Sequence, residues 1–191
     1  QGAPSVLDYD ALNDTVHAVA NTMFTGYDPN ADDAADVTLS MSGLGKTLAI
    51  MGARQTVKMA CFLMLKATKQ IVLTCYTFDL PQIVAGLLGA AARGIQVCVI
   101  ADMGHTLSGA TGQMATRLGE LKQKGVEVLL VRGTTEKTGI QHSKTLLVDS
   151  LLIVGSTNWT ESSMKNNEVS VLLSLHDEGV RSIAYRHGLM I

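Results

Sequence analysis

The sequence predicts an α/β protein with a mixed, mostly parallel β-sheet and helices on both faces. Short runs rich in β-branched and aromatic residues alternate with longer segments whose apolar residues recur at helical spacing. This alternation is typical of βαβ units. Apolar residues make up 47% of the 191 residues and charged residues 17%, a composition that favours a buried core and excludes a disordered chain.

The first 36 residues differ from the remainder and predict a separate N-terminal part. Apolar residues between positions 12 and 23 have helical spacing, and the stretch TGYDPNADDAAD that follows them is a polar loop. The main domain is then expected over 37–191. It begins with a short strand at 37–40 and a long helix at roughly 45–68.

The central segments alternate regularly between strands and helices. Pro81 in a first helical turn, and Gly94 and Gly125 just past two helix ends, mark the boundaries. In chain order we expect strand, helix, strand, helix and strand at 71–78, 80–94, 95–102, 109–125 and 126–131. A strand at 168–173 and a helix at 177–191 complete the domain. Sites in such folds lie at the carboxyl ends of the strands.

The segment QHSKTLLVDSLLIVGSTN, residues 141–158, predicts a hairpin of strands 142–149 and 151–155. Side chains alternate along a strand, so His142 and Lys144 share a face and Asp149 points to the other one.

The second strand of this hairpin returns Ser156 and Asn158 to the neighbourhood of His142. Ammonium, hydroxyl and amide donors suit phosphate oxygens, and an imidazole can attack or transfer protons near neutral pH.

Residues outside the hairpin are weaker candidates for substrate contacts. Arg132 and Lys137 precede the segment and Lys165 follows it, so these side chains could contact phosphates of a nucleic-acid strand. His105 follows a predicted strand, and it either lines the cleft or is an ordinary loop histidine. Trp159 favours packing over base stacking. The net charge of −2 excludes a protein that coats nucleic acid non-specifically.

The sequence H-S-K-T-L-L-V-D-S-L-L-I-V-G-S-T-N resembles the signature of the phospholipase D superfamily, H-x-K-x(4)-D-x(6)-G-S-x-N. The matching positions are His142, Lys144, Asp149, Gly155, Ser156 and Asn158. Five residues separate Asp149 from Gly155 where the family usually has six, which shortens the turn. The strand–helix–strand segment ending in VCVIAD and the later NNEVSVLL also resemble the family, so the similarity covers roughly 37–175. By size and single motif it is similar to the small bacterial endonucleases and mitochondrial cardiolipin hydrolase-like proteins.

The resemblance implies a phospholipase D-like fold and phosphodiester hydrolysis without a metal or cofactor. His142 would attack phosphorus and form a phosphohistidine, and a second histidine would protonate the leaving oxygen. Lys144 and Asn158, with Ser156 in the same motif, would hold the phosphate. Glu168 corresponds to the family glutamate that orients the catalytic histidine. Asp149 belongs to the motif, but its strand parity predicts a structural role.

The single motif supplies half of such a site. The simplest completion is a homodimer in which two copies of His142 face each other, and the alternative is a second motif elsewhere in a longer protein. A nuclease acting on DNA or RNA is the first expectation. A phospholipase acting on cardiolipin or phosphatidylcholine, and a non-catalytic phosphate-binding protein, are the alternatives.

Two further features bear on the compartment. Cys61, Cys75 and Cys98 lie in apolar runs without disulfide or zinc spacing, so we expect free thiols, mostly buried, in a reducing compartment. The chain begins at Gln1 rather than at a methionine, which leaves a preceding anchor or targeting segment open.

Overall fold

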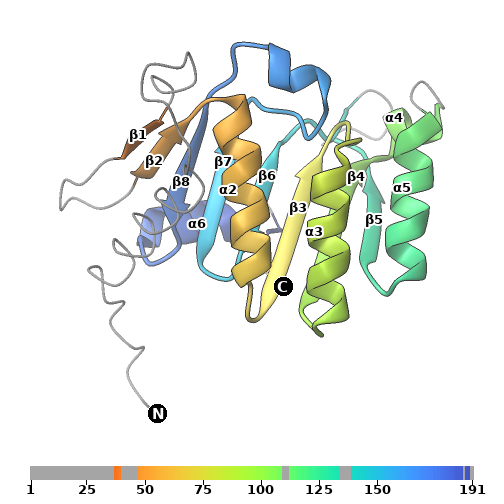
Figure 1. Ribbon diagram of the computed structural model, residues 1–191, viewed down its shortest axis with the longest axis horizontal. Coiled ribbons are helices and arrows are strands. Elements are labelled where there is room, and N and C mark those ends of the chain that lie inside the picture. Colours follow the sequence, from red (N-terminus) through yellow and green to blue (C-terminus); the bar gives the residue numbers. More distant parts are fainter. Residues whose placement is uncertain (1–36, 40–46, 109–111, 134–138, 187, 190–191) are drawn as a thin grey trace, which may run out of the picture. The chain divides into compact units, whose positions relative to one another are not determined.

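This computed structural model describes residues 37–39, 47–108, 112–133, 139–186 and 188–189. The N-terminal helix and loop predicted over 1–36 lie outside the described residues. Within the described part, eight strands form one sheet in the order β1-β2-β8-β7-β6-β3-β4-β5, and helices cover both of its faces (Figure 1). The predicted mixed α/β fold is confirmed.

The elements follow one another along the chain as the sequence pattern predicts, with local differences at their ends. The strands are β1 Val37–Leu39, β2 Thr47–Met51, β3 Gln70–Cys75, β4 Gln96–Asp102, β5 Glu127–Val131, β6 Thr145–Val148, β7 Leu151–Gly155 and β8 Ser170–Ser174. The helices are α2 Ala53–Lys66, α3 Pro81–Ala92, α4 Met103–Leu107, α5 Gly112–Gln123, the 3₁₀ helix η2 Ser162–Lys165 and α6 Glu178–Arg186.

The parallel part of the sheet is smaller than the sequence predicts. β3, β4 and β5 pair in parallel, because α3 and α5 carry the chain back between them. All other pairs of neighbouring strands in the described part are antiparallel. The expectation of a mostly parallel sheet is therefore wrong, since tight hairpins and strands distant in sequence build the other half.

The prediction of a long helix at 45–68 is also wrong for the first part of this range. Residues Thr47–Met51 form β2, and α2 begins only at Ala53. Along β2 the buried Ala49 and Met51 flank the exposed Ile50, which is the alternation of a strand. Pairing of β2 with β1 and β8 decides this conformation, and β8 is too distant in sequence for a local pattern to reveal it.

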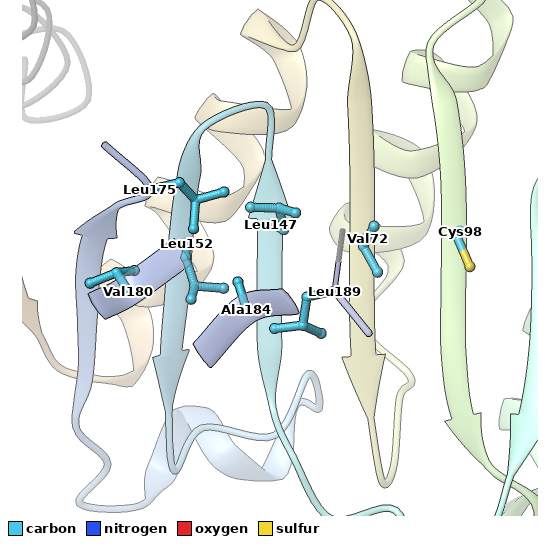
Figure 2. Close-up of a cluster of buried hydrophobic side chains, with 8 residues drawn as sticks. All are labelled: Val72, Cys98, Leu147, Leu152, Leu175, Val180, Ala184 and Leu189. Carbon is cyan, nitrogen blue, oxygen red and sulfur yellow. The ribbon is translucent and has the colours of Figure 1, made fainter. Parts of the chain in front are cut away.

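Two apolar layers hold helices against the sheet. α2 and α3 lie side by side on one face, and α6 lies on the other (Figure 1). Figure 2 shows that Val180, Ala184 and Leu189, from α6 and the residues after it, face side chains of neighbouring strands. The strand side chains of this cluster are Val72, Cys98, Leu147 and Leu152. Each such side chain stabilises the fold by about 1.5–3 kcal/mol relative to exposure to water.

The cysteines agree with the expectation from their sequence context. All three are free, with Cys75 and Cys98 buried and Cys61 partly buried. Burial raises the pKa of the Cys75 thiol to about 12, so this thiol is protonated at neutral pH. Among the described residues, no helix has the length and apolar character needed to cross a membrane.

Candidate active site

Six strands bring polar side chains to one edge of the sheet, here called the site edge. The pairing directions put the carboxyl ends of β3, β4, β5 and β7 at this edge, together with the amino ends of β6 and β8. The predicted residues that adjoin these strand ends are His105, Arg132, His142, Lys144, Ser156, Asn158 and Glu168. The expectation that the site follows strand ends agrees with this arrangement.

His142 and Lys144 lie next to each other, but not through the strand alternation that the sequence suggests. β6 begins at Thr145, so both residues precede the strand. The Lys144 ammonium turns back and donates a hydrogen bond of 2.5 Å to the His142 carbonyl oxygen. Lys144 is buried and His142 is exposed. The motif therefore presents an exposed histidine whose backbone is tied to a sheltered positive charge.

Burial lowers the pKa of Lys144, because an ammonium loses hydration when it is enclosed. The negative charge of Glu168 opposes this effect and raises the pKa. Phosphate oxygens would gain more from a partly desolvated ammonium than from one in water, since local screening is weaker. This arrangement suits the binding of an anion close to His142.

Glu168 contacts Ser156 rather than the histidine that the family resemblance assigns to it. The Ser156 hydroxyl donates a short hydrogen bond to Glu168 Oε2, and Asn166 Nδ2 donates to Glu168 Oε1 at 3.2 Å. The Val169 N–H donates to Ser156 Oγ at 3.1 Å. Within the described part of the chain, the hydrogen bonds of the Glu168 carboxylate are those to Ser156 and Asn166. Orientation of His142 by Glu168 therefore stays a prediction.

A close approach between β7 and β8 fixes the loop that carries Ser156 and Asn158. A Cβ on Gly155 would lie 2.4 Å from the Val169 carbonyl oxygen and 2.5 Å from Ser170 Cα. Only glycine fits there without displacing backbone. Asn158 Oδ1 is buried and has no hydrogen-bond partner among the described residues. A buried amide oxygen without a partner is costly, so this position suits a group that donates a hydrogen bond to it.

Trp159 anchors the end of the same loop. Its side chain is 1% exposed, and its Nε1 donates to the Thr74 carbonyl oxygen at 3.0 Å. Its own carbonyl oxygen accepts hydrogen bonds from the backbone of Asp79 and Leu80. The predicted packing role is confirmed, and the buried indole is closed to base stacking.

Two residues near the histidine were not identified from the sequence. Asp102 ends β4, is 1% exposed, and accepts a 2.8 Å hydrogen bond from the Gln141 N–H. It also accepts from the His105 N–H at 2.6 Å. Tyr76, just after β3, has ring contacts with His105 and His142. Their signal in the sequence is only their place directly at or after a strand end.

His105 lies in α4, a short helix that begins directly after β4, and not in a loop. Its Nε2 is buried without a hydrogen-bond partner in the described part. The structure thus brings His105 to the site edge, where the sequence left its role open.

Asp149 lies at the opposite end of the hairpin from His142. Its carboxylate accepts four hydrogen bonds, from the backbone N–H groups of Thr68, Lys69 and Gln70 and from the Thr68 hydroxyl. Its φ of 52° places it in the left-handed region, which suits the short turn between Val148 and Leu151. The predicted structural role agrees with this position, which separates Asp149 from the catalytic candidates. The predicted strand parity does not explain it, because β6 ends at Val148 and Asp149 lies in the turn.

The predicted substrate-contacting cations are spread along the site edge. Arg132 is exposed after β5, three strand spacings from β6, or about 14 Å. Lys165 is exposed at the end of η2, between β7 and β8. Lys137 lies outside the described residues. Arg132 and Lys165 therefore lie in segments that adjoin strands of the site edge.

Electrostatically, the site edge combines the buried ammonium of Lys144 with the carboxylates of Asp102 and Glu168. In the described part, no three side chains of His, Cys, Asp or Glu come together as a group that could hold a metal ion. The positive charge available to an anion at His142 comes from Lys144 itself.

Comparison with known proteins identifies the family. The family model described as cardiolipin synthase, PLD-like domain, matches residues 61–184. The human mitochondrial cardiolipin hydrolase is 31% identical over 120 residues, which are 62% of this chain and 44% of that protein. The phospholipase D of Rickettsia bellii is 31% identical over 108 residues, 56% of this chain and 49% of that protein. The chain spans about half the length of the curated relatives it matches.

Solved structures agree on the fold. NucT from Helicobacter pylori superposes with a TM-score of 0.61 at 21% identity, over 71% of this chain and 87% of that one. Nuc from Salmonella typhimurium, a phospholipase D family member, gives a TM-score of 0.52 at 24% identity, over 61% of this chain and 73% of that one. With the family match over residues 61–184, and with the motif residues other than Asp149 at one sheet edge, the chain belongs to the phospholipase D superfamily, through its PLD-like domain.

Proposed function

We propose that this protein hydrolyses phosphodiesters, with His142 as the nucleophile. One observation carries the proposal: the exposed His142 accepts, at its carbonyl oxygen, a hydrogen bond from the buried Lys144 ammonium, and both side chains contact the ring of Tyr76. Positioning and charge stabilisation supply most of the catalysis in phosphoryl transfer. In this pair, His142 supplies the nucleophile and Lys144 supplies a fixed positive charge.

The reaction has two steps. In the first, an imidazole nitrogen of His142 forms a bond to phosphorus, the bond from phosphorus to the leaving oxygen breaks, and that oxygen takes a proton from an acid. In the second, water attacks phosphorus, its proton goes to the same acid–base group, and the nitrogen–phosphorus bond breaks. Lys144 and Asn158 hold the phosphate oxygens, and the bonded Ser156–Glu168 pair fixes the neighbouring loop.

The proton donor comes from a second copy of the chain. Attack and leaving take place on opposite sides of phosphorus, so one histidine cannot serve both at once. A homodimer about a twofold axis would provide His142 of the partner subunit as the acid. In mixtures of wild type and His142→Asn, activity should then fall as the square of the wild-type fraction. A linear fall would mean that one chain holds a complete site.

The first substrate class is nucleic acid. Arg132 and Lys165 are exposed in segments that adjoin strands of the site edge, and we propose that they contact phosphates of a strand. Replacing each by alanine should weaken binding of a single-stranded oligonucleotide and reduce its salt dependence. Turnover of a small chromogenic diester should stay unchanged.

A second class, phospholipid, is favoured by apolar side chains exposed near the site. Leu107, Ile140 and Val169 are 69%, 51% and 56% exposed, and they lie close in sequence to His105, His142 and Glu168. Such side chains could enter the surface of a lipid layer. The names of the curated relatives, cardiolipin hydrolase and phospholipase D, agree with this class.

One panel of assays tests these proposals. The wild type and His142→Asn are incubated in EDTA with bis(p-nitrophenyl) phosphate, single-stranded DNA, RNA, duplex DNA, and vesicles of cardiolipin or phosphatidylcholine. The proposal predicts EDTA-resistant cleavage that is lost in His142→Asn. Cleavage that requires an added divalent ion, or that survives in His142→Asn, would contradict it. Phosphate binding without any turnover would favour the non-catalytic alternative.

A further inference from the structure

The ring of Tyr76 is surrounded by three basic side chains of the site edge. Its centroid lies 4.5 Å from that of His105 and 5.1 Å from that of His142, with interplanar angles of 34° and 57°. The Lys144 ammonium lies 5.9 Å from the same centroid. These separations are within the range of aromatic pairs and of cation–π contacts. Among the described residues, the His142 ring thus contacts the aromatic ring of Tyr76.

A buried carboxylate fixes the spacing of the groups around Tyr76. Asp102 accepts one hydrogen bond from the backbone of His105 and another from the backbone of Gln141. It therefore ties the start of α4 to the residue that precedes His142. With Tyr76 following the end of β3, both imidazoles are held in contact with its ring.

His142 would gain from such a support because the hydrogen bonds within the described part of the chain include none to its imidazole. The residue is exposed and precedes β6, and the Glu168 carboxylate is engaged by Ser156 and Asn166. A nucleophile gains most from a fixed orientation towards phosphorus. As its nitrogen bonds to phosphorus, the imidazole also gains positive charge, which the face of an aromatic ring stabilises.

We propose that Tyr76, supported by His105, is a positioning residue that orients the His142 ring for attack. The role rests on the proposed function of His142 as nucleophile. Tyr76 does not contact the phosphate in this assignment: it acts through the imidazole, and its aromatic face rather than its hydroxyl is the required part. Phenylalanine at this position should therefore preserve the activity, and an aliphatic side chain should lower it.

The test compares Tyr76→Phe, Tyr76→Leu and Tyr76→Met with bis(p-nitrophenyl) phosphate as the probe. Loss of the ring should lower kcat about 5- to 30-fold, the effect of a partly desolvated cation–π contact, while KM changes little. Tyr76→Phe should stay within about threefold of the wild type. Tyr185→Leu, at a site that is 76% exposed on α6, is the matched control and should be unchanged.

A spectroscopic readout separates this inference from the proposed function. The ring-proton NMR signals of His142, assigned by their loss in His142→Asn, should move in Tyr76→Leu and Tyr76→Met because the ring current of Tyr76 is removed. They should return close to the wild-type position in Tyr76→Phe. Unmoved signals, or a kcat that is unchanged in the folded Leu and Met variants while His142→Asn is inactive, would overturn the role of Tyr76 alone. Activity that persists in His142→Asn would instead overturn the proposed function.

Discussion

Replacing Asp149 by asparagine should destabilise the protein and leave its catalysis intact. Asparagine tolerates the left-handed conformation that Asp149 adopts, with φ 52°. Its amide keeps one oxygen acceptor but sets an NH₂ group against backbone N–H donors. Two of the four hydrogen bonds to residues 68–70 are then lost. Bonds to a charged acceptor are worth about 1.5–3 kcal/mol each when buried.

The partial exposure of this turn reduces that figure, because water competes for the same groups. We therefore expect a loss of about 2–3 kcal/mol in the free energy of unfolding, which corresponds to a Tm lower by about 4–12 °C for a chain of this size. The reacting groups lie at the other end of β6, four residues or about 13 Å away. The kcat of the folded variant should accordingly equal that of the wild type.

The effect of Asp149 should also depend on pH. Burial opposes its ionisation, but hydrogen bonds from the N–H groups of Gln70, Thr68 and Lys69 and from the Thr68 hydroxyl outweigh it, so the pKa of Asp149 is lowered. A carboxyl whose folded pKa is depressed stabilises the fold above its unfolded pKa, and this stabilisation is lost as the pH falls through the folded pKa. The wild type and Asp149→Asn should therefore become more similar in stability at acidic pH.

Urea unfolding followed by circular dichroism, at neutral and acidic pH, measures both effects. Glu120→Gln, which alters an exposed carboxylate on α5 with an ion pair to Arg117, is the control and should change stability by less than about 0.5 kcal/mol. If Asp149→Asn kept its stability, or lost catalysis while remaining fully folded, the structural role of Asp149 would be refuted.

Three further predictions concern the site edge and the core beneath it. Gly155→Ala should destabilise the protein by about 2 kcal/mol or more, because the new Cβ would meet the backbone of β8. Gly119→Ala, in an open position on α5, should instead stabilise it by about 0.5–1 kcal/mol. Thermal unfolding of both variants tests whether the two changes in stability have opposite signs. Glu168→Gln should lower the pKa of Lys144 further, because it removes the negative charge that raises this pKa. The alkaline fall of the pH–rate profile should therefore move to lower pH. An unmoved profile would contradict the electrostatic coupling between Glu168 and Lys144. Cys75, whose pKa is raised to about 12 by burial, should resist iodoacetamide in the folded protein and react on unfolding, as peptide mapping would show.

The fold class could be predicted because the alternation of strands and helices from 70 to 131 is a local pattern. Each of these strands is a compact apolar run, and each helix has clear boundaries such as Pro81 and Gly94. The conformation of Thr47–Met51 could not be predicted, since its five residues suit a helix as well as a strand. Its partners β1 and β8 decide the outcome, and β8 lies more than 100 residues further along the chain.

The candidate site was predictable where one segment carries it. The spacing from His142 to Asn158 identifies the motif. The separate role of Asp149 was expected from strand parity, but it comes from the turn after β6. The neighbours of His142 were not predictable, because Tyr76 and Asp102 reach it from β3 and β4 through tertiary contacts. The partner of Glu168 was not predictable for the same reason, because its hydrogen bond with Ser156 depends on the register between β7 and β8.

The most direct test of the central claim is to trap the covalent intermediate. The protein is mixed with bis(p-nitrophenyl) phosphate in EDTA, quenched under alkaline conditions that preserve a phosphohistidine, and digested for mass spectrometry. We predict a burst of p-nitrophenolate and a p-nitrophenyl phosphate adduct on the peptide that contains His142, both absent from His142→Asn. Turnover without any adduct on His142, or an adduct on another residue, would contradict the role of His142 as the nucleophile.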